Sequence, residues 1–221
     1  MNRMVGKKPE HETIYRRVKN MILFGEFVPG QPLTIHGLAE QIGTGITPAR
    51  EAIRRLTAEG ALSTLENRRI AVPQMTATKL DHIALVRLAV EPELARLASF
   101  SLENKDIDEL ERIDSLINDA ITMGDIRQYL EANYQFHFTL YSRADAPILQ
   151  DIADGLWLRV GPALRVVCGR FGTDKLVDHH REATTAMRQG DANAVGESMA
   201  EDIRQGLAFV RQTLSEPSTD A

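Results

Sequence analysis

The spacing of prolines and glycines along the sequence changes near residue 75, and this change constrains the fold more than any other feature. Up to Pro73, prolines and glycines interrupt the chain at short intervals, so only short helices and strands fit between them. From about Thr76 onward, long stretches carry apolar residues at helical spacing with few interruptions. The sequence therefore predicts a mainly α protein of two domains, residues 1–75 and residues 76–221.

The first domain has the pattern of three short helices followed by a hairpin. Thr34 can cap the second helix and Thr47 the third, with Pro48 at the first helical position, where its missing N–H costs nothing. Two β-prone runs flank a polar tip. The helices are expected around residues 14–22, 35–42 and 48–59, and the strands around residues 62–65 and 70–72. This order of elements predicts a winged helix-turn-helix.

A domain of this kind reads DNA with its third helix, which enters the major groove. Arg50 lies in the first turn of that helix, where its guanidinium can hold O6 and N7 of a guanine. Arg68 and Arg69 at the hairpin tip can reach flanking phosphates or the minor groove. Each arginine taken alone also fits a solvated surface. Taken together, the predicted DNA contacts are Thr47, Arg50, Arg54, Arg68 and Arg69.

The net charge of the chain also changes sign near residue 75. The net charge of the whole chain is −5, which by itself argues against nucleic acid as a partner. Residues 1–75, however, carry 11 Lys and Arg against 7 Asp and Glu, whereas residues 76–221 carry 15 against 24. A basic domain can neutralise phosphates, and an acidic domain is repelled by them. The split favours a DNA-binding domain followed by a domain with another partner.

Simpler features exclude several classes of protein. No apolar run approaches the roughly 20 residues of a transmembrane helix, and the N-terminus lacks the apolar core of a secretory signal. The single cysteine, Cys168, excludes an internal disulfide framework and a zinc site with several cysteines. These features predict a cytoplasmic protein without a membrane partner.

The first domain contains FGEFVPGQPL at residues 24–33 and TPAREAIRRL at residues 47–56. With further matches at residues 38–39, 42–43 and 59–60, these segments resemble the DNA-binding domain of the GntR family of bacterial regulators. Two departures stand out. Gly45 and Ile46 occupy the positions of a usual Ser-Arg pair, and Arg69 replaces a usual glycine in the wing. The resemblance implies operator binding, with an altered sequence preference because the first arginine is missing.

The second domain is predicted to be an antiparallel all-α bundle of about six helices, because the linkers are short. The fourth of these helices is expected to be interrupted near Gly161 and Pro162. The helices are expected at about residues 78–102, 104–123, 125–141, 147–167, 174–189 and 191–214.

Four polar residues lie on otherwise apolar faces of these helices. Asn133 and His137 are four residues apart, on one face of the third helix. His180 and Asp202 lie on apolar faces of the fifth and sixth helices. Together they offer two imidazoles and two oxygen ligands, a set that suits a divalent ion such as zinc, manganese or nickel. For each histidine alone, the alternative is a core residue hydrogen-bonded to the backbone.

The second domain also resembles the FCD effector domain of the FadR subfamily, through LVRLAVE at residues 85–91, NYQFH at residues 133–137 and HR at residues 180–181. Members of that subfamily often bind a metal through an Asp or Asn, the histidine four residues later and two further histidines. The resemblance implies the same role for Asn133, His137 and His180, with Asp202 in the fourth position. It also implies an effector pocket lined by Arg87, Asn133, His137 and His180.

Arg87 has two interpretations. Its guanidinium can clamp the carboxylate of an effector. It can equally form an ion pair with Glu91 on the next helical turn.

The resemblance implies a transcription regulator and not an enzyme. A homodimer would place two recognition helices on an inverted repeat, and a small carboxylate in the bundle, with or without a metal, would change operator affinity. Most such relatives are repressors released by their ligand. Two alternatives follow from the residues alone: a metal-dependent hydrolase built on His137, His180 and Asp202, for which no general base or HExxH pairing is evident, and a metal sensor.

Overall fold

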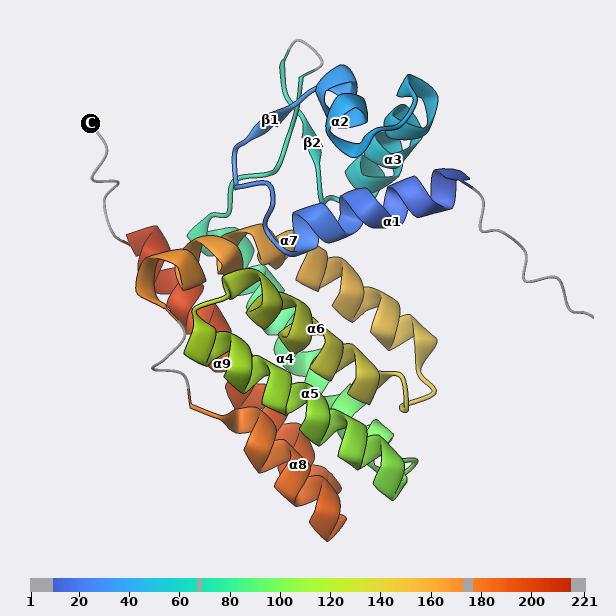
Figure 1. Ribbon diagram of the computed structural model, residues 1–221. Helices are drawn as coiled ribbons and strands as arrows, with labels where there is room; N and C mark the ends of the chain where they lie inside the picture. Colours follow the sequence, from blue (N-terminus) through green and yellow to red (C-terminus); the bar gives the residue numbers. More distant parts are fainter. Residues whose placement is uncertain (1–9, 67–68, 173–176, 216–221) are drawn as a thin grey trace, which may run out of the picture.

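The computed structural model describes residues 10–66, 69–172 and 177–215, and the structural statements below concern this part of the chain. It contains nine α-helices and three strands of two residues each. Figure 1 shows a small helix-and-strand unit at one end and a bundle of long helices below it. The mainly α fold, a winged helix-turn-helix followed by an all-α bundle, is thereby confirmed.

The first unit has the element order of a winged helix. Its strands form one antiparallel sheet in the order β1-β3-β2, in which Ile70 is paired with both Leu33 and Thr64. The sequence did not predict β1, because two residues are too few to show an alternating pattern. The elements are α1 (Glu10–Leu23), β1 (Pro32–Leu33), α2 (Ile35–Ile42), α3 (Ile46–Ala58), β2 (Ser63–Thr64) and β3 (Ile70–Ala71).

The two predicted helix caps of this unit differ in outcome. Thr34 caps α2 as expected, because its Oγ1 accepts a hydrogen bond from the Gly37 N–H at 3.0 Å. The prediction that Thr47 caps α3 was wrong. The helix begins earlier, at Ile46, with Gly45 as its N-cap and no side-chain cap. Pro48 is therefore the third helical residue, where its missing N–H leaves no intrahelical bond unmade.

The second unit is a bundle of six helices, in the number that the sequence predicts. Its helices are α4 (Ala77–Ser99), α5 (Asn104–Met123), α6 (Ile126–Tyr141), α7 (Pro147–Phe171), α8 (His179–Gln189) and α9 (Ala192–Ser215). The predicted interruption of α7 was wrong, because the helix continues through Gly161 and Pro162. Buried residues on both sides, Trp157, Leu158 and Val160 before and Ala163 after, show that packing holds this helix together.

The winged-helix unit packs directly on the bundle through α1 and α7 (Figure 1). One apolar cluster continues from one unit into the other, and it joins Phe24 to Leu130, Trp157 and Leu158. A side chain at Gly161 would place its Cβ 2.2 Å from the Leu23 carbonyl oxygen. The glycine is therefore required by the close approach of the two helices.

No helix in the ranges that the structure covers is long and apolar enough to cross a membrane.

Candidate functional site

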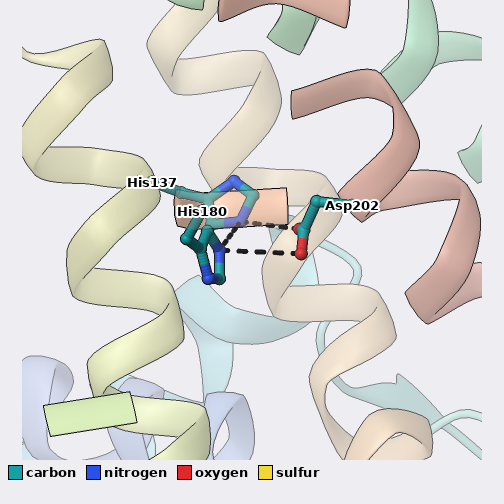
Figure 2. A group of neighbouring side chains, drawn as sticks. All are labelled: His137, His180 and Asp202. Atoms are coloured by element: carbon teal, nitrogen blue, oxygen red, sulfur yellow. Dashed lines mark hydrogen bonds and ion pairs between the residues drawn. The ribbon is translucent and has the colours of Figure 1, made fainter. Parts of the chain in front are cut away.

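Three helices of the bundle direct polar side chains at one another. His137 comes from α6, His180 from α8 and Asp202 from α9, and Figure 2 shows the two rings and the carboxylate meeting at one point. His137 and His180 are buried, and Asp202 is half-buried. The sequence predicted that these three residues converge, and the structure brings them together.

The distances between their ligand atoms fit a shared metal ion. His137 Nε2 lies 3.0 Å from Asp202 Oδ2 and 3.4 Å from His180 Nε2, and His180 Nε2 lies 3.6 Å from Asp202 Oδ1. Two ligand atoms about 2.0–2.1 Å from a tetrahedral ion are about 3.3 Å apart. All three separations are close to that value, although they involve both oxygens of Asp202, and one ligand atom from each residue lies within 4.8 Å of the others. The cluster is therefore compact enough for a single ion to contact all three residues.

Asn133 is a further candidate oxygen ligand. It lies one helical turn before His137 on α6 and lines the same cavity as Asp202. Its Oδ1 is buried and makes no hydrogen bond to any residue in the described part of the chain. A buried acceptor without a partner costs free energy, and a metal ion would satisfy it. The donor set and the unsatisfied amide oxygen therefore both fit a divalent cation.

The protonation states also suit metal binding. Burial lowers the pKa of His180 to about 4, although Asp202 opposes the shift. Burial by itself would raise the pKa of Asp202, but His180, His137 and Arg87 together hold it well below its usual range. At neutral pH the site therefore offers His180 as a neutral imidazole and Asp202 as a carboxylate, the forms that bind metals.

A second carboxylate group lies on the far side of His180. Asp114 Oδ1 is 3.8 Å from His180 Nδ1, and it is buried without a hydrogen-bond partner among the described residues. Burial, with a contribution from Asp178, raises the pKa of Asp114 to about 6. The two nitrogens of His180 thus face different carboxylates, Asp202 and Asp114.

Arg87 forms an ion pair with Glu91, which is one of the two roles that the sequence allowed for it. Its Nε and Nη2 donate to Glu91 Oε1 and Oε2 at 2.5 and 3.1 Å, and both side chains are buried. Its guanidinium also lies over the ring of Trp157, 4.4 Å from the centroid. Arg87 still lines the cavity, but two of its nitrogens are already bound to Glu91.

Sequence reasoning missed the residues that complete this network. Tyr141 Oη and Trp157 Nε1 both donate to Glu91 Oε2, at 3.0 and 2.9 Å, and Tyr141 Oη is 2.9 Å from His137 Nδ1. Tyr141 follows His137 by one helical turn, which was the only local signal. Trp157 is 66 residues from Glu91 in sequence, so nothing short of the tertiary structure reveals the contact.

The cavity beside the cluster has a polar side and an apolar side. Arg87, Asn133 and Asp202 supply the polar groups, and Val167 and Phe209 are among the apolar residues. A small ligand with one polar end and one apolar end matches such a wall pattern.

Three of the predicted DNA contacts, Thr47, Arg50 and Arg54, belong to α3, which lies with α2 and the strands at one end of the molecule (Figure 1). Thr47, Arg50 and Arg69 are exposed, and neither arginine has an ion-pair partner among the residues that the structure covers. Arg54 is exposed too, but it donates to both oxygens of Glu51 at 2.9 and 2.6 Å. Arg68 lies outside the described residues.

Two family models match the chain. The model described as "Bacterial regulatory proteins, gntR family" matches residues 10–72, and the model described as "FCD domain" matches residues 82–205. The HTH-type transcriptional regulator McbR of Escherichia coli (strain K12) is 30% identical over 198 residues, which cover 88% of this chain and 90% of McbR. The probable D-xylose utilization operon transcriptional repressor of Paenarthrobacter nicotinovorans is 26% identical over 190 residues, which cover 84% of each protein.

Solved structures agree with these matches. The structure of E. coli McbR/YncC is similar to this chain with a TM-score of 0.88 at 28% identity, covering 94% of this chain and 99% of that one. The crystal structure of a transcriptional regulator GntR from Rhodococcus sp. RHA1 has a TM-score of 0.74 at 18% identity and supports the fold alone. These families and relatives are transcriptional regulators and not enzymes, which removes the support for a hydrolase.

Proposed function

The chain belongs to the GntR family of bacterial regulatory proteins and carries an FCD domain. From this premise we propose that the protein is a repressor. In this proposal its operator affinity is controlled by a small organic acid that binds beside a divalent metal ion. The observation that carries the proposal is the convergence of His137, His180 and Asp202, whose ligand atoms have the spacing of a shared ion. Binding of operator DNA is a property of the family.

The proposed ion is held by His137 Nε2, His180 Nε2, Asp202 and the unsatisfied Oδ1 of Asn133. When bound, it supplies a positive centre to which a carboxylate can attach. Asp202 cancels one of its two charges, and Glu91 cancels the charge of Arg87. Among these charges, which are the ones on the side of the cavity, one positive charge is left over. The cavity therefore favours a monocarboxylate whose apolar part lies against Val167 and Phe209.

We propose that the effector acts on the winged-helix unit through α6 and α7. The ring of Trp157 is 4.8 Å from the ring of His137, and Tyr134 makes edge contacts with both Trp157 and Phe24. Tyr134 Oη also donates to Asp154, which forms an ion pair with Lys19 of α1. A ligand that shifts α6 or Trp157 therefore changes the placement of α1. Effector control of DNA binding requires that the ligand favour one placement of the winged-helix unit over another.

The DNA contacts in this proposal are Arg50 for bases, Thr47 beside the N-terminus of α3, and Arg69 for phosphates, with Arg54 as a weaker contributor because Glu51 competes for it. Arg68 stays a sequence prediction for the same surface.

An inverted-repeat operator calls for a homodimer. We propose that the second copy covers a face of α4 and α7, two helices that pack on each other. Three large aliphatic side chains are exposed there, Leu85 on α4 and Ile148 and Ile152 on α7. Exposed large aliphatic side chains on two adjoining helices are candidates for an interface between copies. Leu85→Asp with Ile152→Asp should produce a monomer in light scattering, and an unchanged dimer would contradict this choice of face.

The effector part of the proposal is tested by metal content and operator affinity together. Wild type should contain one divalent ion per chain by elemental analysis, and His137→Ala should contain none while keeping its affinity for operator selected from random DNA. A screen of small monocarboxylates should find acids that weaken operator binding in wild type but not in His137→Ala. Equal responses would rule out this pocket. Release of DNA by metal or chelator alone would identify a metal sensor instead.

A further inference from the structure

We propose that Glu91 and Tyr141 are positioning residues for the metal site: they fix the proton of His137 on Nδ1, so that Nε2 is directed at the ion. Arg87 serves as the buried counter-ion that keeps Glu91 in place. The inference rests on the metal site of the proposed function, but its main observable, the position of one proton, can be measured without metal.

Glu91 accepts hydrogen bonds and donates none. Its carboxylate is fully buried and receives Arg87 through two nitrogens, together with the Trp157 indole N–H and the Tyr141 hydroxyl. Arg87 and the indole N–H are donors only. A carboxylate with four such contacts has no proton to give to Tyr141.

The next step follows from the single proton of the Tyr141 hydroxyl. A phenol is protonated at neutral pH, because its ordinary pKa is about 10. Tyr141 Oη is 3.0 Å from Glu91 Oε2, and the only proton available for that contact is its own. The hydroxyl oxygen can therefore only accept from His137 Nδ1, 2.9 Å away.

His137 must accordingly carry a proton on Nδ1. A direct bond from Nδ1 to Glu91 Oε2 is excluded by their separation of 3.9 Å. In the neutral imidazole, Nε2 is then an unprotonated nitrogen that faces Asp202 Oδ2 at 3.0 Å. Two acceptors at this distance repel each other unless a cation lies between them. The network thus creates, at Nε2 of His137, a position that a proton or a metal ion has to fill.

The two histidines of the site differ in this respect. His137 has a hydrogen-bonded partner on Nδ1, and that partner is held by helices α4 and α7 as well as α6. The Nδ1 of His180 faces Asp114 at 3.8 Å, too far for a hydrogen bond. His137 is therefore the preoriented ligand, whereas no hydrogen bond within the described residues fixes the Nδ1 of His180. Partners of this kind typically change metal affinity by about 10- to 100-fold.

The test compares two tyrosines on the same helix. Tyr141→Phe removes the hydroxyl of the chain, and Tyr134→Phe removes a hydroxyl that donates to Asp154 and contacts neither histidine. The affinity of the metal-free full-length protein for Zn²⁺ is measured by competition with a chromophoric chelator. Tyr141→Phe should bind Zn²⁺ at least about 10-fold more weakly, and Tyr134→Phe should match wild type. Equal affinity of Tyr141→Phe and wild type would overturn the proposal.

The second measurement locates the proton by ¹⁵N NMR of the histidine rings in the metal-free protein. His137 should carry it on Nδ1 in wild type and in Tyr134→Phe. In Tyr141→Phe it should move to Nε2, where Asp202 accepts it. A proton on Nε2 alone in wild type would overturn the proposal even if Zn²⁺ binds. Failure of wild type to bind Zn²⁺, with the proton on Nδ1, would instead contradict the metal site and leave the positioning chain intact.

Glu91→Gln provides an independent variant. Its amide can donate to the Tyr141 hydroxyl, which then donates to His137 Nδ1 and moves the ring proton to Nε2. The NMR signature of Tyr141→Phe should therefore appear in Glu91→Gln as well. A proton that stays on Nδ1 in a folded Glu91→Gln would show that Glu91 does not set it.

Discussion

The recognition helix and the centre of the bundle each place an arginine in a site, and they use it in opposite ways. Arg50 on α3 is exposed and has no carboxylate partner in the ranges that the structure describes. Arg87 on α4 is buried, and a buried Glu91 takes up two of its nitrogens. A guanidinium can read a ligand only where its donors are left free. Arg50 therefore suits recognition, whereas Arg87 suits the support of neighbouring groups.

Two further ion pairs lie between these extremes. The pair between Lys19 and Asp154 joins the two units and is mostly buried, with side-chain exposures of 18% and 27%. The pair between Arg54 and Glu51 is open to solvent, at 70% and 41%. The cost of losing a charge should fall in the same order as burial, because water replaces a lost partner at the surface and not in the core.

The largest effect on stability is expected from Arg87→Ala. The change leaves the carboxylate of Glu91 buried without its counter-ion, which typically costs about 3–5 kcal/mol. The free energy of unfolding, measured by urea denaturation, should fall by this amount. A loss below about 1 kcal/mol would mean that the pair behaves like a surface pair, and the comparison with Arg50 would fail.

Arg50→Ala should have the largest effect on DNA and almost none on stability. A bidentate contact with guanine contributes about 1–3 kcal/mol, so the affinity for the operator should fall at least about 10-fold at fixed salt concentration. Fluorescence anisotropy with labelled operator measures the affinity, and the melting temperature serves as the control for folding. Unchanged operator binding would show that α3 does not read bases through Arg50.

Asp154→Asn should give an intermediate effect. The asparagine can still accept the hydrogen bond from Tyr134, but the attraction to Lys19 is lost. A double-mutant cycle with Lys19→Met should yield a coupling of about 1 kcal/mol. A coupling of zero would indicate that the two units are joined by apolar packing alone.

The smallest effect is expected from Arg54→Ala. Its partner, Glu51, is solvated when released, so the melting temperature should stay that of wild type. Operator affinity should fall less than in Arg50→Ala, because Glu51 already occupies the guanidinium. A loss of operator affinity equal to that of Arg50→Ala would show that DNA displaces Glu51 from Arg54. An arginine in an exposed ion pair would then bind DNA as readily as an unpaired one.

Local patterns were sufficient for much of the fold. Helical periodicity located six helices of the bundle, and turn residues with β-prone runs located the recognition unit. Both signals depend on neighbours within a few residues, which is why they are readable in sequence. The errors came where packing prevailed over local preference: α7 continues through Gly161 and Pro162 because α1 packs against it, and α3 begins before Thr47.

The candidate site was predictable in part for the same reason. The spacing of Asn133 and His137 and the apolar surroundings of His180 and Asp202 pointed to the bundle interior, and the structure brings His137, His180 and Asp202 together. The contribution of Arg87 was not decidable in sequence. Glu91, four residues away, was visible as a partner, but Tyr141 and Trp157 reach Glu91 from 50 and 66 residues away.

By itself, the sequence determined most helices and strands, the boundary near residue 75 in both residue spacing and net charge, and the residue types that carry the chemistry. These features depend on local spacing and composition. Only the tertiary structure decided which buried polar groups have a hydrogen-bond partner. This outcome depends on burial and on contacts between α4, α6, α7, α8 and α9. Within the described ranges, these contacts leave the Oδ1 of Asn133 without a hydrogen-bond partner, and they direct the Nε2 of His137 at Asp202. A buried polar group must find its partner inside the protein, so the fold, and not the residue type, fixes what each side chain can do.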